Sequence, residues 1–245
     1  MRDINVWAYH SDFGSLCPNA ALDDSTGLRY PSGNRQGQAD WHVAVQFGTL
    51  HELADKLTRG LPMPSQFCGN WFQDCEPVKR GEIVRLALMS HGDQGGRVMV
   101  DGRAATSVLT ATTARSFHTD LHNIGLYTRE RGSTILLMGC LAGQGRDGTA
   151  LLVELSRVWP GRRVVGFTTI GYRHPGEMKR RGDPCELPGM RDTDAPAGLY
   201  ADPRRFDSLW RDFTAMPWAA ESSIHAKVVF NGAVVRCPPD EVCTP

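Results

Sequence analysis

Apolar residues along the chain gather into short runs with the length of β-strands, separated by polar and glycine-rich segments. Such runs predict five strands, INVWAYH (4–10), WHVAVQF (41–47), EIVRLALMS (82–90), STILLMGC (133–140) and RRVVGFTTIGY (162–172). The runs at 82–90 and 133–140 are apolar almost throughout. This is typical of parallel strands that are covered on both faces.

Three segments between these runs have helical features. The segment 49–60 begins with Thr49 as an N-cap and ends at Gly60, which predicts a short amphipathic helix. In the segment 112–132 apolar residues recur at helical spacing, and Gly132 is expected to end the helix. A third helix is predicted over 147–161.

The order of these elements indicates one domain built on a parallel sheet. Strands and helices alternate through the middle of the chain, which predicts right-handed crossovers. We expect a single α/β domain over 1–245, with its core at about 82–170. Asn231-Gly232 between two apolar runs predicts a β-hairpin over about 225–236, and a smaller strand pair is predicted at 95–103.

Two long segments have neither pattern. Residues 18–40 are rich in turn-forming types and predict a surface loop. Residues 171–205 combine prolines, glycines and charges of both signs, so we expect a mobile loop that borders a functional site. The basic run 179–181 inside it is interpreted either as a solvated stretch or as a processing site. The segment 208–217 is expected to be helical.

Composition narrows the possible partners. Among 245 residues, 27 Lys or Arg balance 27 Asp or Glu, which gives no support for a nucleic-acid or anionic-membrane partner. No apolar run approaches the roughly 18 residues of a membrane span, and the first residues do not resemble a signal peptide. We therefore expect a cytoplasmic protein without a membrane partner. The pattern predicts no oligomeric state.

The cysteines argue for free thiols. There are seven, an odd number without a CxxC pair, which is unlike a disulfide framework or a zinc ribbon. Cys68 with Cys75, and Cys237 with Cys243, could close small loops in an oxidising compartment. In a cytoplasmic chain these four are expected to be free.

His91 and Cys140 stand at the ends of two predicted strands. Ligands and chemistry gather at the carboxyl ends of parallel strands, and the crossover 104–132 would make these two strands neighbours. Adjacent strands lie about 4.8 Å apart, so an imidazole and a thiol leaving the same edge can meet. We therefore expect a Cys-His pair at this edge.

Such a pair suits nucleophilic catalysis. A thiol attacks a carbonyl carbon as its thiolate, and a nearby imidazole can take the thiol proton and later return it to a leaving amine. Backbone N–H groups of Gly92 and Cys140 are candidates to stabilise the oxyanion that attack creates.

Each motif alone has a simpler interpretation. A buried cysteine at a strand end is more often inert, and a single His-Gly is more often a turn. The pair favours catalysis because both residues follow apolar strands, both have glycines beside them, and a predicted helix lies between them.

The segments LALMSHG and ILLMGC resemble the caspase-like cysteine peptidases of clan CD, which include caspases, metacaspases, gingipains and bacterial CHAT-type peptidases. In that family one apolar strand ends in His-Gly, and another ends in a small or polar residue followed by Cys, with the His of caspases about 50 residues upstream. The resemblance covers roughly 82–170. It implies a caspase-like three-layer sandwich, with a mostly parallel central sheet flanked by helices. It also implies His91 as base, Gly92 as oxyanion donor and Cys140 as nucleophile.

The chain departs from this family where specificity is set. Met138 stands where caspases have a glutamine and metacaspases have an aspartate that binds basic side chains. Neither specificity is therefore transferred. Met138 and Asp12, which follows the first strand, are retained as candidate substrate-pocket residues.

These observations predict a cysteine endopeptidase that cleaves protein or peptide substrates through an acyl-thioester, without metal or cofactor. Regulation by a separate protein is left open. One alternative is an inactive caspase-like module that binds a partner protein, and another is a cysteine hydrolase acting on non-peptide acyl groups.

Two further patterns are interpreted without a ligand. His118 and His122 have chelating spacing but no evident acidic third ligand, so exposed helix histidines are expected. The glycine-rich segment 143–148 lacks the Lys and Ser/Thr of a phosphate loop.

Overall fold

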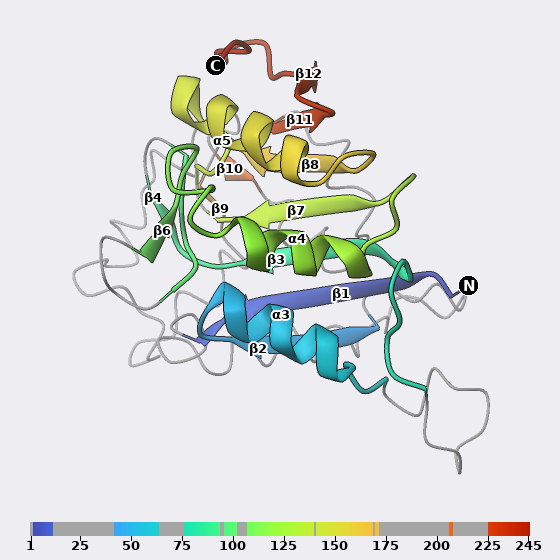
Figure 1. Cartoon of the computed structure of the whole chain (residues 1–245). Coiled ribbons are helices and arrows are strands. Elements are labelled where there is room, and N and C mark those ends of the chain that lie inside the picture. The colour runs from blue at the N-terminus through green and yellow to red at the C-terminus, as the bar shows by residue number, and fades with distance from the viewer. Residues whose placement is uncertain are drawn as a thin grey trace.

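A seven-stranded, mostly parallel sheet forms the centre of the protein (Figure 1). The computed structural model describes residues 2–11, 42–63, 76–93, 96–101, 107–139, 141–168, 170–171, 206–207 and 225–245. In sheet order, the strands are β12 (Ala233–Arg236), β11 (Ala226–Phe230), β8 (Arg163–Phe167), β7 (Thr134–Met138), β3 (Ile83–Met89), β1 (Ile4–His10) and β2 (Val43–Phe47). The strands from β8 to β2 are parallel to one another, and β11 and β12 are added as antiparallel strands.

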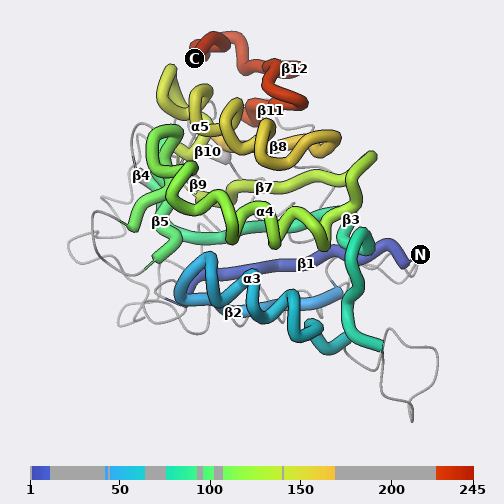
Figure 2. Tube along the Cα trace, in the orientation of Figure 1, coloured from blue at the N-terminus to red at the C-terminus, as the bar shows by residue number. Residues whose placement is uncertain are grey.

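The predicted strands and their direction are confirmed. All five are present. β1 has the predicted bounds, β2, β3 and β7 are shorter than their apolar runs, and the run predicted as one strand at 162–172 is divided between β8 and a second short strand, β9 (Ile170–Gly171). The succession β3, helix, β7, helix, β8 is parallel as expected. Figure 2 shows that the chain begins inside the sheet at β1 and then adds strands outward on both sides. The hairpin β11–β12 is also confirmed. Its turn residues Asn231 and Gly232 have φ of 49° and 79°, the left-handed pair that a tight hairpin needs.

Three helices, α3 (Leu50–Arg59), α4 (His118–Tyr127) and α5 (Gly145–Val158), pack on one face of the sheet (Figure 1). In α3 the hydroxyl of Thr49 accepts from the backbone N–H of Glu52, and Gly60 with φ of 94° ends the helix, as predicted. A helix is favoured here because the N-cap, the apolar face and the terminating glycine all specify the same segment.

The prediction for α4 was wrong at both ends. Before the helix, the hydroxyl of Thr113 donates to the carbonyl of Val108 and accepts from the N–H of Thr110, which holds turns instead of helix. After it, Thr128 is extended and forms a bridge with Ile83, so the helix ends well before Gly132. Pairing with the sheet outweighed local helical spacing.

Both faces of the sheet are buried. Leu86, Leu88, Ile135 and Leu137 belong to the larger apolar cluster together with the buried residues of the helices. On the other face a second cluster is buried equally well and contains Trp7, Ala87, Met89, Leu136, Met138, Val165, Phe167, Ala226 and Val228. Burial on both faces agrees with a three-layer α/β arrangement and explains the continuous apolar runs.

Two small sheets lie beside the main one. β4 (Gly92–Asp93), β5 (Arg97–Met99) and β6 (Val108–Leu109) form an antiparallel sheet, and β9 (Ile170–Gly171) pairs with β10 (Phe206–Asp207) in parallel. Of the strand pair predicted at 95–103, β5 is the one strand among the residues of that segment that the structure describes, 96–101. The predicted loop at 171–205 was wrong at its first residue, because Gly171 ends β9. The rest of that loop, the predicted loop at 18–40 and the predicted helix at 208–217 lie outside the described residues.

The expectation of free thiols was wrong for one cysteine pair. Cys237 and Cys243 form a disulfide that closes a small loop after β12. Their short separation in sequence already brings them within bonding reach, and local spacing alone does not indicate the redox state. Cys68 and Cys75 lie outside the described residues. None of the helices in the described part of the chain has the length and apolar character to cross a membrane.

Candidate functional site

The carboxyl ends of β3 and β7 lie next to each other at the middle of the sheet. The two strands pair in parallel up to Met89 and Met138, which are register partners. His91 is two residues beyond the first of these, and Cys140 is two residues beyond the second. Cys140 and Asp12 lie outside the described residues, so the site is built from the residues around them.

The segments that follow the two strands remain in contact. A Cβ atom placed on Gly139 would lie 3.5 Å from the carbonyl oxygen of Ser90 and 3.5 Å from both N and Cα of Gly92. The residues on either side of His91 therefore run along the residue that precedes position 140. This close approach of two backbones is the feature that links the two sequence motifs in space.

The backbone of His91 is held by the neighbouring small sheet. Its carbonyl accepts from the N–H of Met99 at 2.9 Å and from the hydroxyl of Ser90 at 3.2 Å. The residue itself is half-buried. These contacts fix the main chain at the strand end before any substrate is present.

Gly92 presents its N–H away from this small sheet. Residue pairs of an antiparallel ladder alternate between hydrogen-bonded and non-hydrogen-bonded types. The bond from Met99 N–H to the carbonyl of His91 makes His91 and Met99 a hydrogen-bonded pair. The pair of Gly92 with Val98 is then of the other type, with its N–H directed away from β5. The nitrogen of Gly92 is also an atom that faces Gly139. This geometry suits a donor to an oxyanion.

A constrained turn follows β7. Leu141 has φ of 59°, a left-handed conformation that is unfavourable for a leucine. Two hydrogen bonds hold this turn, from Ala142 N–H to the carbonyl of Gly139 at 3.3 Å and from Gln144 N–H to the carbonyl of Leu141 at 2.9 Å. Such strain is concentrated at functional sites. No sequence signal marked Leu141, because leucine has no preference for positive φ.

Glycines fasten this turn and the start of α5 to the sheet edge. A Cβ on Gly143 would lie 2.6 Å from the carbonyl oxygen of Gly166 in β8, and one on Gly148 would lie 2.8 Å from that of Gly143. A Cβ on Gly96, in the β4–β5 connection, would collide with the backbone of Gly148. Gly143 also donates to the carbonyl of Phe167 at 2.8 Å. No local pattern in the sequence indicates that these glycines pack against one another.

Two side chains at the end of β1 border the same edge. Tyr9, the register partner of Met89, is half-buried, and its burial raises the pKa of the phenol, so it stays protonated at neutral pH. His10 is buried, and its Nε2 lies 2.9 Å from the carbonyl oxygen of Gly48. Met138 is fully buried in the second apolar cluster. Its role as a pocket residue stays a prediction.

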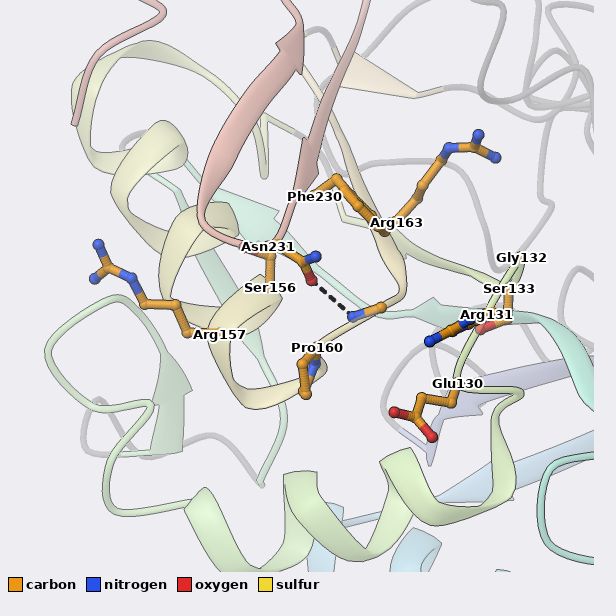
Figure 3. Close-up of a pocket in the computed structure, with 11 residues that line it drawn as sticks. Glu130, Arg131, Gly132, Ser133, Ser156, Arg157, Pro160, Arg163, Phe230 and Asn231 are labelled. Atoms are coloured by element: carbon orange, nitrogen blue, oxygen red, sulfur yellow. Dashed lines mark hydrogen bonds between the residues drawn. The ribbon is translucent and has the colours of Figure 1, made fainter.

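A cavity of about 680 Å³ lies at the opposite edge of the sheet, where β7 and β8 begin (Figure 3). Figure 3 shows Arg157 and Arg163 extending away from each other, and the side-chain oxygen of Asn231 accepts from the N–H of Gly161 at 2.7 Å. The charged groups around this cavity do not converge on one point. Of the predicted site residues that the structure describes, His91, Gly92 and Met138, none lines it.

The histidine pair on α4 does not form a metal centre with other described residues. The rings of His118 and His122 stack with centroids 6.2 Å apart, and His51 pairs with Asp120 at 3.0 Å. Within the described ranges, no group of three or more His, Cys, Asp or Glu side chains is arranged to hold a metal ion.

The described residues at the carboxyl edge supply an imidazole, a directed backbone N–H and a rigid turn around position 140. Together these can activate a thiol and stabilise an oxyanion. No protein-family model, curated protein or solved structure matches the chain.

Proposed function

We propose that the protein is a cysteine endopeptidase with a caspase-like fold, in which Cys140 is the nucleophile and His91 the general base and acid. The contact of Gly139 with Ser90 and Gly92 is the observation that carries this proposal. It is supported by the register of Met89 with Met138, since both reactive residues stand two positions beyond that pair.

The proposed reaction has two steps. His91 takes the proton of Cys140, and the thiolate attacks the carbonyl carbon of the scissile bond to give an oxyanion, towards which the N–H groups of Gly92 and Cys140 donate. The carbon–nitrogen bond then breaks as the imidazolium gives its proton to the leaving amine, which leaves an acyl-thioester. Water, deprotonated by His91, attacks the thioester. The carbon–sulfur bond then breaks, which releases the acid, and the thiolate takes back the proton that His91 removed from water.

The start of α5 supports the nucleophile. Position 140 precedes Gly145, the first residue of this helix, by five residues. A hydrogen bond from Gln144 N–H to the carbonyl of Leu141 joins the helix start to the residue after position 140. The left-handed Leu141 lets the chain turn from β7 into α5 over these few residues.

The remaining features of the proposal concern access and control. The segment 171–205 would border the substrate cleft and be a candidate for cleavage on activation, and a separate protein could regulate the enzyme. We propose a cytoplasmic location. Disulfides of cytoplasmic proteins are usually transient or redox-sensing, so this location requires Cys237–Cys243 to be a redox-labile pair.

The test is cleavage of a positional peptide library by the wild type and by two single variants. Cys140→Ala and His91→Ala should each lower kcat/KM by on the order of 10³-fold or more, because neither half of the pair acts alone. His122→Ala, which replaces an exposed histidine on α4, is the matched control and should cleave the library like the wild type.

The other outcomes identify the alternatives. An intact fold without labelling of Cys140 by a peptide electrophile would indicate a module that binds a partner protein. Hydrolysis of a small thioester without cleavage of any library peptide would indicate a hydrolase of non-peptide acyl groups. Unchanged cleavage by Cys140→Ala would eliminate the proposed nucleophile.

A further inference from the structure

The first residue of α5 is capped by a residue that lies far along the chain. The N–H of Gly145 donates to a carboxylate oxygen of Glu241 at 2.9 Å. The helix's own N-cap, Gln144, makes no side-chain capping bond. A carboxylate at this point also faces the positive end of the helix dipole. The helix start therefore depends on the segment that carries Glu241.

A buried lysine holds that segment in place. Lys227 of β11 is fully buried, and its Nζ donates to the carbonyl of Val242 at 2.7 Å and to the hydroxyl of Thr149 at 2.8 Å. The same Nζ lies 3.4 Å from the carboxylate of Glu241. Burial lowers the pKa of Lys227, and the carboxylate of Glu241 raises it. Without this segment, the ammonium group would lose the carboxylate of Glu241 and the carbonyl of Val242, and would keep the hydroxyl of Thr149 and the carbonyl of Gly145.

The residues that make these contacts lie inside a covalent loop. The disulfide joins Cys237, just after β12, to Cys243, and Glu241 and Val242 are between them. Cys243 is exposed and Cys237 is half-buried, so a reductant can reach the bond from the side of Cys243. We call residues 237–243 the disulfide loop. Opening the disulfide would remove the tie that keeps Glu241 against α5.

The start of α5 is in turn joined to the candidate site. Gln144 donates to the carbonyl of Leu141, and Gly143 donates to the carbonyl of Phe167 in β8. Gly148 packs against Gly143 with no room for a side chain. A shift at Gly145 therefore reaches Leu141, the residue next to Cys140, through backbone contacts alone.

We propose that the disulfide loop is a redox-dependent clasp in which Glu241 is a positioning residue for the turn beside Cys140. Its effect on Cys140 rests on the proposed function, whereas its hold on α5 does not. A dithiol reductant opens the clasp. One thiolate attacks Sγ of Cys243 and displaces the Cys237 thiolate, and the second thiol then resolves the mixed disulfide. The chain gains two thiols, and the reductant leaves as its disulfide.

The experiment compares oxidised protein with protein reduced by dithiothreitol and then freed of it under argon. Mass spectrometry of the peptide containing 237–243 establishes each state. Two properties are measured, amide hydrogen exchange at Gly145 and the rate at which a peptide electrophile labels Cys140. Reduction should speed exchange at Gly145 by about tenfold and slow labelling by about fivefold, the size of a lost helix cap.

Variants separate the clasp from a general effect of reduction. Cys237→Ser/Cys243→Ser should label at the reduced wild-type rate whether or not dithiothreitol was applied. Oxidised Glu241→Ala should also label at that rate and no longer respond to reduction. Glu241→Gln keeps an acceptor for the N–H of Gly145, so it should retain part of the response. Asp240→Asn, an exposed neighbour of Glu241, should behave like the wild type.

The outcomes that overturn the inference are distinct from failure of the proposed function. Equal hydrogen-exchange rates at Gly145 in the oxidised and reduced protein would contradict the proposal that the disulfide loop holds the start of α5. Faster exchange at Gly145 on reduction, with an unchanged rate of labelling at Cys140, would show that Glu241 does not position the turn beside Cys140. If Cys140 is never labelled and no peptide is cleaved, but exchange at Gly145 still responds to reduction, the peptidase proposal fails and the hold of the loop on α5 stands.

Discussion

The two edges of the central sheet are stabilised by different kinds of contact. At the carboxyl edge of β7 and β8, backbones touch through Gly143, Gly148 and Gly166, with no side chains between them. At the amino edge, arginine side chains bridge separate segments. Arg2 contacts Glu82 at 2.6 Å, and the buried Arg162 donates to the carbonyls of Gly125 and Pro160 at 2.8 Å each.

This difference indicates where chemistry can be accommodated. Glycine contacts bring main chains close while occupying no space with side chains, so N–H groups and a reactive side chain can share one small volume. Arginine bridges occupy the amino edge and use its carbonyls as acceptors. The charged residues that line the cavity at that edge, Glu130, Arg131, Arg157 and Arg163, do not converge on one point, whereas the carboxyl edge has its backbone positioned around the His91 motif.

The largest expected effect comes from filling the glycine contact. Gly148→Ala should destabilise the protein by at least about 3 kcal/mol, because the new Cβ would overlap the backbone of Gly143. Alanine in a helix is normally stabilising relative to glycine, so the sign is opposite to helix propensity. Urea unfolding measures the change.

Gly139→Ala is the matched control for that substitution. Its Cβ would make only ordinary contacts at 3.5 Å, so the free energy of unfolding should change by less than about 1 kcal/mol. Equal destabilisation by the two alanines would contradict the role given to the Gly143–Gly148 contact.

Acid should weaken the amino edge. Hydrogen bonding to Arg2 is the main cause that lowers the pKa of Glu82 from 4.5 to about 2. Since the folded pKa is the lower one, the stabilisation is complete above pH 4.5 and is lost as the pH falls from 4.5 towards 2. The full effect is about 3 kcal/mol.

Urea unfolding between pH 2 and 6 tests this dependence. Glu82→Gln has no carboxylate to titrate, so its stability should fall less steeply than that of the wild type over the same range. Identical slopes for the two proteins would show that the pair does not contribute.

Removing the buried arginine should have a somewhat smaller effect. Arg162→Met removes the donor to the carbonyl of Pro160 and to the hydroxyl of Thr128, and one of the donors to the carbonyl of Gly125, which should cost about 2 kcal/mol. Arg157→Met is the control, since Arg157 is largely exposed and its ion pair within the described part of the chain is with Glu154. Thermal unfolding distinguishes the two, and a larger loss for Arg157→Met would reverse the expected order.

The smallest effect is expected at an exposed ion pair of the same edge. Arg129 contacts Asp3 at 2.7 Å, but the side chain of Asp3 is 69% exposed. Asp3→Asn should therefore lower stability by less than about 1 kcal/mol, and added salt should reduce the difference further. A loss that persists in high salt would mean that this pair is more than a surface contact.

The sequence was informative wherever neighbouring residues decide the structure. Apolar runs identified the strands, Thr49 and Gly60 identified the limits of α3, and Asn231-Gly232 identified the hairpin. The same local reasoning failed at α4, where bridging of Thr128 to Ile83 ends the helix early. The apolar run before His91 and Gly92 also identified these two residues as a strand-end motif.

Only the tertiary structure decided which distant segments meet. The contact of Gly139 with Gly92, the left-handed Leu141, the packing of Gly143 on Gly166 and the capping of Gly145 by Glu241 leave no trace in local patterns. Strand formation depends on side-chain periodicity within a few residues, so a single sequence records it. Close backbone packing depends on which strands become neighbours, and that is settled only when the whole core is buried.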